Sequence, residues 1–307
     1  MLAPVDRVEV TVVIDNFLDV LMAGEQGVRR YQARDFGAAE QLVAEHGFSA
    51  LVSVERDGNR RTVLYDAGLT PHALARNLDV LQVPVGELRA IVISHGHADH
   101  HGGLEGLVRC RGRSRLPLVI HPDAWRERRI AFPSGGELRL PPPSRHDLEA
   151  EGLEVVEECA NSLLLDGAVL VSGQVERVTE FETGFPIHEA CEGDGWRPDP
   201  MIWDDQALVL NVRDRGLVII SGCSHAGVIN VLFHAQRLTG RPASPACSAA
   251  CISPADCSKR ASHQRSRRCE PPALIASCPR TARAGRRSTR SPVPCPTPSC
   301  SPRWERP

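Results

Sequence analysis

Four histidines and one aspartate are gathered in residues 93–103, which read ISHGHADHHGG. The segment follows a short apolar run and ends in two glycines. Imidazole and carboxylate groups held this close together compete with or repel one another unless a positive charge lies between them. The cluster therefore predicts a metal site at the end of a buried strand, and the fold must bring further ligands to it.

The residues before the cluster predict a hairpin, a helix and a strand. Residues 50–68 contain two β-rich runs around Asp57-Gly58, which is a strong signal for a tight hairpin turn. A helix is expected over 71–81, with proline in its first turn and leucines at helical spacing. Residues 90–94, AIVIS, form the kind of continuous apolar run that is buried on both faces of a sheet. A further helix is expected to open after the two glycines.

A second passage repeats this plan. Residues 207–221 predict another hairpin, which leads into the loop GCSHAG and then into an amphipathic helix over 228–238. Both passages therefore predict the same order of elements, which is hairpin, strand, histidine-bearing loop and helix. This order predicts an α/β protein, an αββα sandwich with its helices outside and both loops at one edge. Asp66, residues 95–100 and the pair Cys223/His225 should then lie near one another.

The cluster itself has the pattern H-x-H-x-D-H. In an extended segment His95, His97 and Asp99 point the same way, and a turn at the end can swing His100 around. Two neutral imidazoles suit zinc, whereas a mixed set of histidine and carboxylate also accepts iron or manganese. The alternative is a run of surface histidines, but the strand-end position and the second histidine loop argue against it.

This pattern, with VLYDAG ahead of it, resembles the metallo-β-lactamase superfamily. The resemblance implies an αββα sandwich with a one- or two-metal site at one edge. The segments HGFSALV (46–52), DDQALVLNV (204–212) and SGCSHAGVIN (221–230) are similar to the branch of dihydropterin-methyl-ribofuranosylaminobenzene phosphate synthase-like proteins. The resemblance covers about residues 8–240.

The resemblance also implies functional residues. The implied ligands are His95 and His97 for one ion, Asp99 and His100 for a second, and Cys223 or His225 from the second half. Asp99 and His100 are the expected catalytic residues, because Asp99 could orient a nucleophile or pass a proton. The chain departs from the family pattern at three places. Gln174 or Glu176 stands where an intervening histidine is expected, Cys223 or His225 replaces an aspartate, and a final histidine beyond residue 240 has no counterpart.

Several of these side chains have a second interpretation. We expect Asp66 to accept a hydrogen bond from a ligand histidine or its loop, and the alternative is a helix N-cap ahead of Pro71. Cys223 is either a zinc thiolate or a small buried apolar residue. His225 is either a ligand or a cap for the helix that follows it.

Other candidates carry weaker expectations. We expect His101 to face solvent and His121 to end a strand before a helix. By default we expect Asp204-Asp205 to be a solvated strand entry, and only the family resemblance makes the pair a functional candidate. His46, His188 and His234 have no partner pattern. Residues 182–205 predict a long loop, which either covers a substrate or lies on the surface anchored by two tryptophans.

Charge divides the chain near Gly240. Residues 1–240 carry a net charge of −12, whereas residues 241–307 carry 12 Arg and one Lys against three acidic residues, a net charge of +10. The acidic body would repel a phosphate backbone, and an aromatic content of 4% offers little for base stacking. With no signal peptide and no run of the ~20 apolar residues that cross a bilayer, we expect a cytoplasmic protein with a small-molecule substrate and no nucleic-acid or membrane partner.

Residues 241–307 differ in kind from the body. They are rich in Arg, Pro, Ser and Ala, contain seven of the 11 cysteines, and show no C-x-x-C pair typical of zinc fingers. This composition predicts a disordered tail that supplies neither a core strand nor an amphipathic helix. The body has no lysine, as expected of GC-rich coding, and GC-rich DNA read out of frame yields this tail composition. We therefore hypothesise a frameshift near residue 241, which leaves a domain of residues 1–240 incomplete at its C-terminal end.

Three functions fit these observations. The first is a metal-dependent hydrolase, with zinc as the expected ion, acting on a small ester or phosphate. The second is a transferase like the synthases of the branch. The third is a metal-binding remnant without activity.

Overall fold

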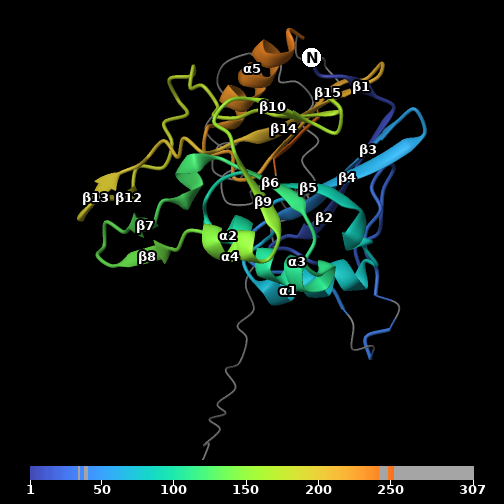
Figure 1. Cartoon of the computed structure of the whole chain (residues 1–307), viewed down its shortest axis with the longest axis horizontal. Helices are drawn as coiled ribbons and strands as arrows, with labels where there is room; N and C mark the ends of the chain where they lie inside the picture. The colour runs from blue at the N-terminus through green and yellow to red at the C-terminus, as the bar shows by residue number, and fades with distance from the viewer. Residues whose placement is uncertain (34, 38–40, 242–247, 252–307) are drawn as a thin grey trace, which may run out of the picture. The chain divides into compact units, whose positions relative to one another are not determined.

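The computed structural model describes residues 1–33, 35–37, 41–241 and 248–251, all of which belong to one compact unit, residues 1–277 (Figure 1). A sheet from the first half of the chain forms one of its layers, with the order β2-β3-β4-β5-β6-β9. Its strands are β2 (Arg7–Ile14), β3 (Ser49–Arg56), β4 (Asn59–Tyr65), β5 (Leu88–Val92), β6 (Leu116–Ile120) and β9 (Leu153–Glu157). The helices α1 (Pro71–Val80) and α3 (Leu104–Arg111) pack on its outer face. The short helix α4 (Arg145–Ala150) precedes β9.

The second large sheet comes mainly from the later half of the chain, with one short strand from its beginning. It has the order β10-β11-β14-β15-β16, and β1 pairs with β14. Its strands are β1 (Pro4–Val5), β10 (Ser162–Leu164), β11 (Val169–Val171), β14 (Ala207–Val212), β15 (Gly216–Ser221) and β16 (Ser248–Cys251). Helix α5 (Val228–Thr239) covers its outer face, and Figure 1 shows α5 on the opposite side of the two sheets from α1 and α3.

Three groups of buried apolar side chains hold these layers together. The central group lies between the two sheets, with Val52, Val63 and Val92 on one side and Leu208 and Leu210 on the other. A second group joins the first sheet to α1 and α3, and a third joins the second sheet to α5. Burying each such side chain contributes ~1.5–3 kcal/mol. The predicted αββα sandwich is confirmed.

The local predictions hold because each rests on short-range geometry. Asp57 and Gly58 both have positive φ, at 51° and 75°, as the tight turn between β3 and β4 requires. Helix α1 begins at the predicted proline, and the N-cap is Thr70, whose Oγ1 accepts from Ala73 N–H. The second hairpin, β14 and β15, and helix α5 lie where the sequence predicts them.

A small third sheet was not predicted. It has the order β13-β12-β7-β8, with β7 (Arg128–Ala131), β8 (Glu137–Leu140), β12 (His188–Glu192) and β13 (Gly195–Pro198). The prediction of an irregular loop over 182–205 is therefore wrong, since a hairpin lies within it. Its cross-strand packing includes the guanidinium groups of Arg129 and Arg139, 4.5 and 5.0 Å from the Trp196 ring.

The histidine cluster also departs from prediction in part. The extended backbone ends at His97, and residues Ala98–His101 form one helical turn, α2. Gly102 N–H donates to the carbonyl of Ala98 and closes that turn. Short helical turns also follow β6 and precede β5, as η2 (Pro122–Trp125) and η1 (Val85–Glu87).

Ser248–Cys251 pair in parallel with β15 at the edge of the sheet, although the sequence predicts no core strand after residue 240. The reason is that a ladder is made of backbone hydrogen bonds, which an unpaired strand edge offers to any extended segment. Residues 242–247 and 252–307 lie outside the described residues, so the predicted disorder and the frameshift stay predictions. Within the part of the chain that is described, no helix has the length and apolar character needed to cross a membrane.

Candidate metal centre

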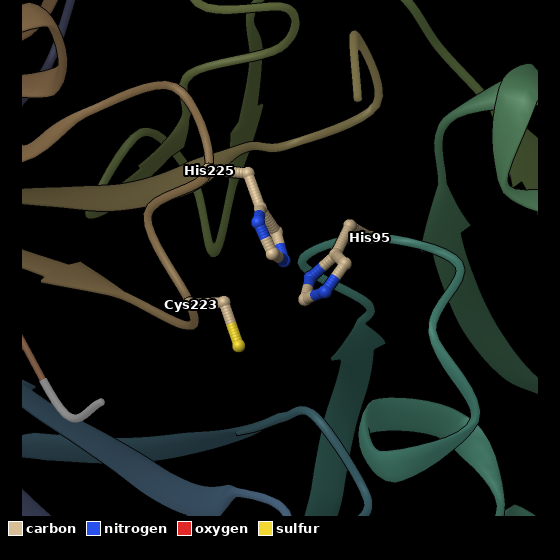
Figure 2. Close-up of side chains that lie close together, drawn as sticks. All are labelled: His95, Cys223 and His225. Carbon is tan, nitrogen blue, oxygen red and sulfur yellow. The ribbon is translucent and has the colours of Figure 1, made fainter. Parts of the chain in front are cut away.

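The two strand-end histidine loops meet. The ring of His225, which follows β15, lies 4.7 Å from that of His95 and 4.9 Å from that of His97, centroid to centroid. Figure 2 shows His225 and Cys223 extending from one loop toward His95 on the other. The predicted approach of the two halves at this edge is confirmed.

The first loop is packed too tightly to carry a side chain at Gly96. A Cβ there would clash with the backbone of Ala124. The Gly96 N–H donates to Asp204 Oδ2 at 2.7 Å. Residue 96 therefore has to be glycine for His95 and His97 to reach inward from either side of it.

Asp66 orients the next imidazole. Its Oδ2 lies 2.7 Å from His100 Nδ1 and accepts from Ser94 Oγ, and its Oδ1 accepts from Ser94 N–H. Asp66 is fully buried and does not cap α1, whose cap is Thr70. Burial disfavours a charged His100, but the acidic groups around it, including Asp66 and Asp99, outweigh burial and hold the pKa of His100 well above its usual value.

The imidazoles of His95, His97 and His225 favour the neutral form. Burial and the neighbouring imidazoles hold the pKa values of His95 and His97 well below the usual value. Burial likewise lowers the pKa of His225 to about 3. Each of these rings therefore keeps a lone pair available, which is the form that binds a metal ion.

The lone pair of His95 points into the cluster. Ser94 Oγ uses its single proton on the Asp66 carboxylate, which can only accept. His95 Nδ1, 2.9 Å from Ser94 Oγ, must then be the donor in that contact. His95 Nε2 is left without a proton, and it faces His97 Nδ1 at 3.0 Å.

Two sets of possible ligand atoms result, each with its atoms within 4.8 Å of one another. One set is His95, Cys223 and His225, and the other is Asp99, His100 and Cys223. Cys223 belongs to both, and its Sγ lies 3.1 Å from His100 Nε2. Burial raises the pKa of the Cys223 thiol, so without a cation it stays protonated.

His225 Nε2 is buried and has no hydrogen-bond partner. Leaving a buried polar atom without a partner costs ~1–3 kcal/mol. His225 also does not cap α5, whose N-cap is Gly227 with no side-chain cap. The geometry therefore leaves His225 Nε2 free to bind a metal ion.

His188 is the side chain that sequence reasoning missed. It opens β12, is fully buried, and its Nε2 lies 2.8 Å from His97 Nε2. Phe185 stacks against it, with ring centroids 6.1 Å apart, and against His225 at 6.3 Å. The long-range pairing of β12 with β7 positions His188, and no local pattern signals that pairing.

The pair Asp204-Asp205 is not a solvated strand entry, because both side chains are buried. Asp204 receives two hydrogen bonds from the fully buried Arg128, of 2.8 and 2.6 Å. Asp205 Oδ2 accepts from Ala226 N–H, and burial raises the pKa of Asp205 to about 7. The enclosure of Asp204 comes with Arg128 of the small sheet, which the sequence did not predict, whereas Asp205 is held by the loop at Ala226.

The prediction that His101 faces solvent is also wrong, because the α2 turn directs it inward, and burial lowers its pKa to about 4. His121 does follow β6 and caps η2. Glu176, one candidate for the intervening ligand, is paired with Arg237 instead, and Gln174 is exposed. His46 Nε2 lies 3.4 Å from Asp99 Oδ2 at the surface, and His234 Nε2 contacts the Ser172 carbonyl.

This fold and cluster define a class of protein. Residues 46–233 match the model of the metallo-beta-lactamase superfamily, and the chain belongs to that superfamily. A crystal structure of a metal-dependent hydrolase of the beta-lactamase superfamily superimposes with a TM-score of 0.55 and 20% identity, covering 80% of this chain and 76% of that one. That likeness shows a shared fold.

Two proteins of Methanocaldococcus jannaschii are similar in sequence. An uncharacterized protein is 31% identical over 209 residues, which make up 67% of this chain and 73% of that protein. The other, named 7,8-dihydropterin-6-methyl-4-(beta-D-ribofuranosyl)-aminobenzene-5'-phosphate synthase, is 26% identical over 203 residues, or 64% of this chain and 67% of that protein.

Proposed function

We propose that the chain is a metal-dependent hydrolase that binds one or two zinc ions and acts on a small ester or phosphate. The observation that carries the proposal is the buried His225 Nε2 without a partner, which lies among neutral imidazoles. Imidazole nitrogens together with a thiolate are ligands that zinc prefers, and a mixed set of histidine and carboxylate would also accept iron or manganese.

The two sets already described supply most of the proposed ligands, and His97 is added to the first because its Nδ1 lies 3.0 Å from His95 Nε2. His95, His97 and His225 would hold one ion, Asp99 and His100 a second, and Cys223 would lie between them. A zinc ion held by these residues would lower the pKa of a coordinated water toward ~7 and would polarise a substrate oxygen. The donor set fits this chemistry because neutral imidazoles, one carboxylate and one thiolate leave a net positive charge on a centre of two ions.

Asp99 is the side chain best placed to move a proton. Its carboxylate lies 3.5 Å from His100 Nε2 and its side chain remains 16% exposed, so it can reach solvent. His100 is held by Asp66 and would keep its orientation throughout the reaction. Phe185 would give the substrate an apolar wall beside His225.

A transfer reaction is the second candidate, and the similarity to the named synthase favours it. In that reaction the same residues would orient two substrates and exclude water instead of using it. Asp99 would then hold a proton near the substrate atoms that become bonded, and water would not take part.

Metal analysis combined with a substrate panel tests the proposal. We expect zinc to copurify in stoichiometric amount, phosphodiester, phosphomonoester or thioester substrates to be hydrolysed, and His97→Ala to abolish turnover. Joining of a pterin to an aminobenzene ribofuranosyl phosphate without hydrolysis would favour the transferase. A chain with neither bound metal nor turnover would be the inactive remnant, and the proposal would fail.

A further inference from the structure

We propose that His188, from the small sheet, is a positioning residue that fixes which nitrogen of His97 faces the metal. The inference rests on the proposed metal centre and adds a residue that the H-x-H-x-D-H pattern does not contain. It follows from three consecutive contacts that run from the backbone of Asp199, directly after β13, to His95.

The first contact fixes the proton on His188. Its Nδ1 lies 2.8 Å from the backbone carbonyl of Asp199, and a carbonyl can only accept a hydrogen bond. His188 Nδ1 therefore carries the proton. A neutral imidazole has one N–H, so His188 Nε2 is an acceptor.

The second contact fixes the proton on His97. His188 Nε2 and His97 Nε2 lie 2.8 Å apart, at hydrogen-bond distance. Because His188 Nε2 has none to give, His97 Nε2 must donate. His97 Nδ1 is then bare.

The third contact shows what this arrangement does. The bare His97 Nδ1 lies 3.0 Å from His95 Nε2, which Ser94 and Asp66 likewise leave without a proton. Two lone pairs in a buried site repel each other unless a cation lies between or beside them. His188 thus does for His97 what Ser94 does for His95, and both nitrogens are prepared for the same ion.

The small sheet holds His188 in a fixed place. His188 N–H donates to the Phe185 carbonyl, and its own carbonyl accepts from Asp199 N–H at 2.9 Å. The same sheet carries Arg128, which binds Asp204 and through it the Gly96 N–H. The loop of His95 and His97 is therefore supported from two strands, β7 and β12, outside the two large sheets.

The experiment uses the full chain with three substitutions. His188→Gln keeps an amide oxygen near the position of Nε2, His188→Asn reaches only the position of Nδ1, and His188→Leu removes both contacts. His234→Leu, a buried histidine of α5 away from the cluster, is the control. Zinc affinity is measured by competition with a chromophoric chelator, and the His97 tautomer by nitrogen-15 NMR of the metal-free protein.

In the unchanged chain we expect His97 to be protonated at Nε2. His188→Leu and His188→Asn should bind zinc ~10–100-fold more weakly, the usual effect of losing a partner behind a ligand, with a mixed His97 tautomer. His188→Gln and the control should stay near the unchanged affinity. If His188→Leu does not fold, the contrast between Gln and Asn decides.

Two results would overturn the inference. One is a His97 protonated at Nδ1 in the unchanged, metal-free chain, which would make Nε2 the ligand and His188 a competing ligand. The other is unchanged zinc affinity in the folded Leu and Asn variants. Failure of the unchanged chain to bind zinc would instead refute the proposed function, and the NMR measurement would still test the tautomer.

Discussion

Arg128 and Asp204 form a two-pronged ion pair in which neither side chain is exposed, with hydrogen bonds of 2.8 and 2.6 Å. Paired bonds of this kind are strong and directional. The pair joins a strand of the small sheet to the loop before β14, and Asp204 also accepts from the Gly96 N–H. The Asp204 carboxylate thus serves two purposes. It holds the small sheet to the loop before β14, and it fixes the backbone of the candidate metal loop at Gly96.

Replacing Arg128 with methionine should therefore be costly. The Asp204 charge would be buried without its partner, and breaking one side of a buried pair costs ~3–5 kcal/mol. Urea unfolding measures this loss in the free energy of unfolding. Arg145→Met is the control, because Arg145 pairs with Glu149 and Glu157 at the surface, where such pairs contribute ~0–1 kcal/mol. Equal effects of the two substitutions would contradict the prediction.

We predict that His95→Ala removes metal more completely than Cys223→Ala. His95 is fully buried and its Nε2 faces the cluster, whereas the protonated thiol of Cys223 can act as packing. Elemental analysis of the two purified variants decides. Full metal loss in Cys223→Ala with none in His95→Ala would show that the ligand assignment is wrong.

Gly96→Ala should weaken zinc binding by about tenfold or more, since the added methyl group would push the loop away from Ala124 and disturb both flanking histidines. The same chelator competition measures the change. Gly86→Ala, in η1, is the matched control because a Cβ there meets no atom within 4 Å. A Gly96→Ala protein with unchanged affinity would mean that the loop can shift without cost.

The metal-free protein should lose stability as the pH falls from about 6.5 toward about 4. The pKa values of His95, His97, His101 and His225 are lowered in the folded chain, to about 4 for His101 and about 3 for His225. In this window the unfolded chain binds protons that the folded chain excludes. The raised pKa of His100 acts in the opposite direction only above its unfolded value, so it adds no slope here. The pKa of Asp205, raised to about 7, does act in the opposite direction within this window, but the four histidines outweigh this single group. Urea midpoints that stay constant across this window would refute the prediction.

The sequence predicted the features that depend on short-range patterns. The turn at Asp57-Gly58 and the helix over Val228–Thr239 each follow from residues within a few positions of one another. The meeting of His95 and His225 also followed, because two hairpin–strand–loop units packed face to face place both loops at one edge.

What the sequence did not reveal depends on the small sheet. β12 pairs with β7, so that His188 lies opposite Ile130, and no local signal predicts a pairing over that separation. Without that sheet, His188 had no partner and Asp204 had no reason to be buried. Its absence from the predicted fold accounts for both errors.

The hydroxyl of Tyr65 donates to the Gln206 carbonyl and accepts from the Gly222 N–H, 141 and 157 residues away. Closing such large loops is entropically unfavourable, and contacts between distant residues form slowly. A growing chain would therefore complete its first histidine loop well before the residues that face it have been synthesised. We expect ion capture to be among the last events of folding, so zinc supplied early in refolding would stay exchangeable with a chelator. Early, chelator-resistant retention would instead show that the first loop binds the ion alone.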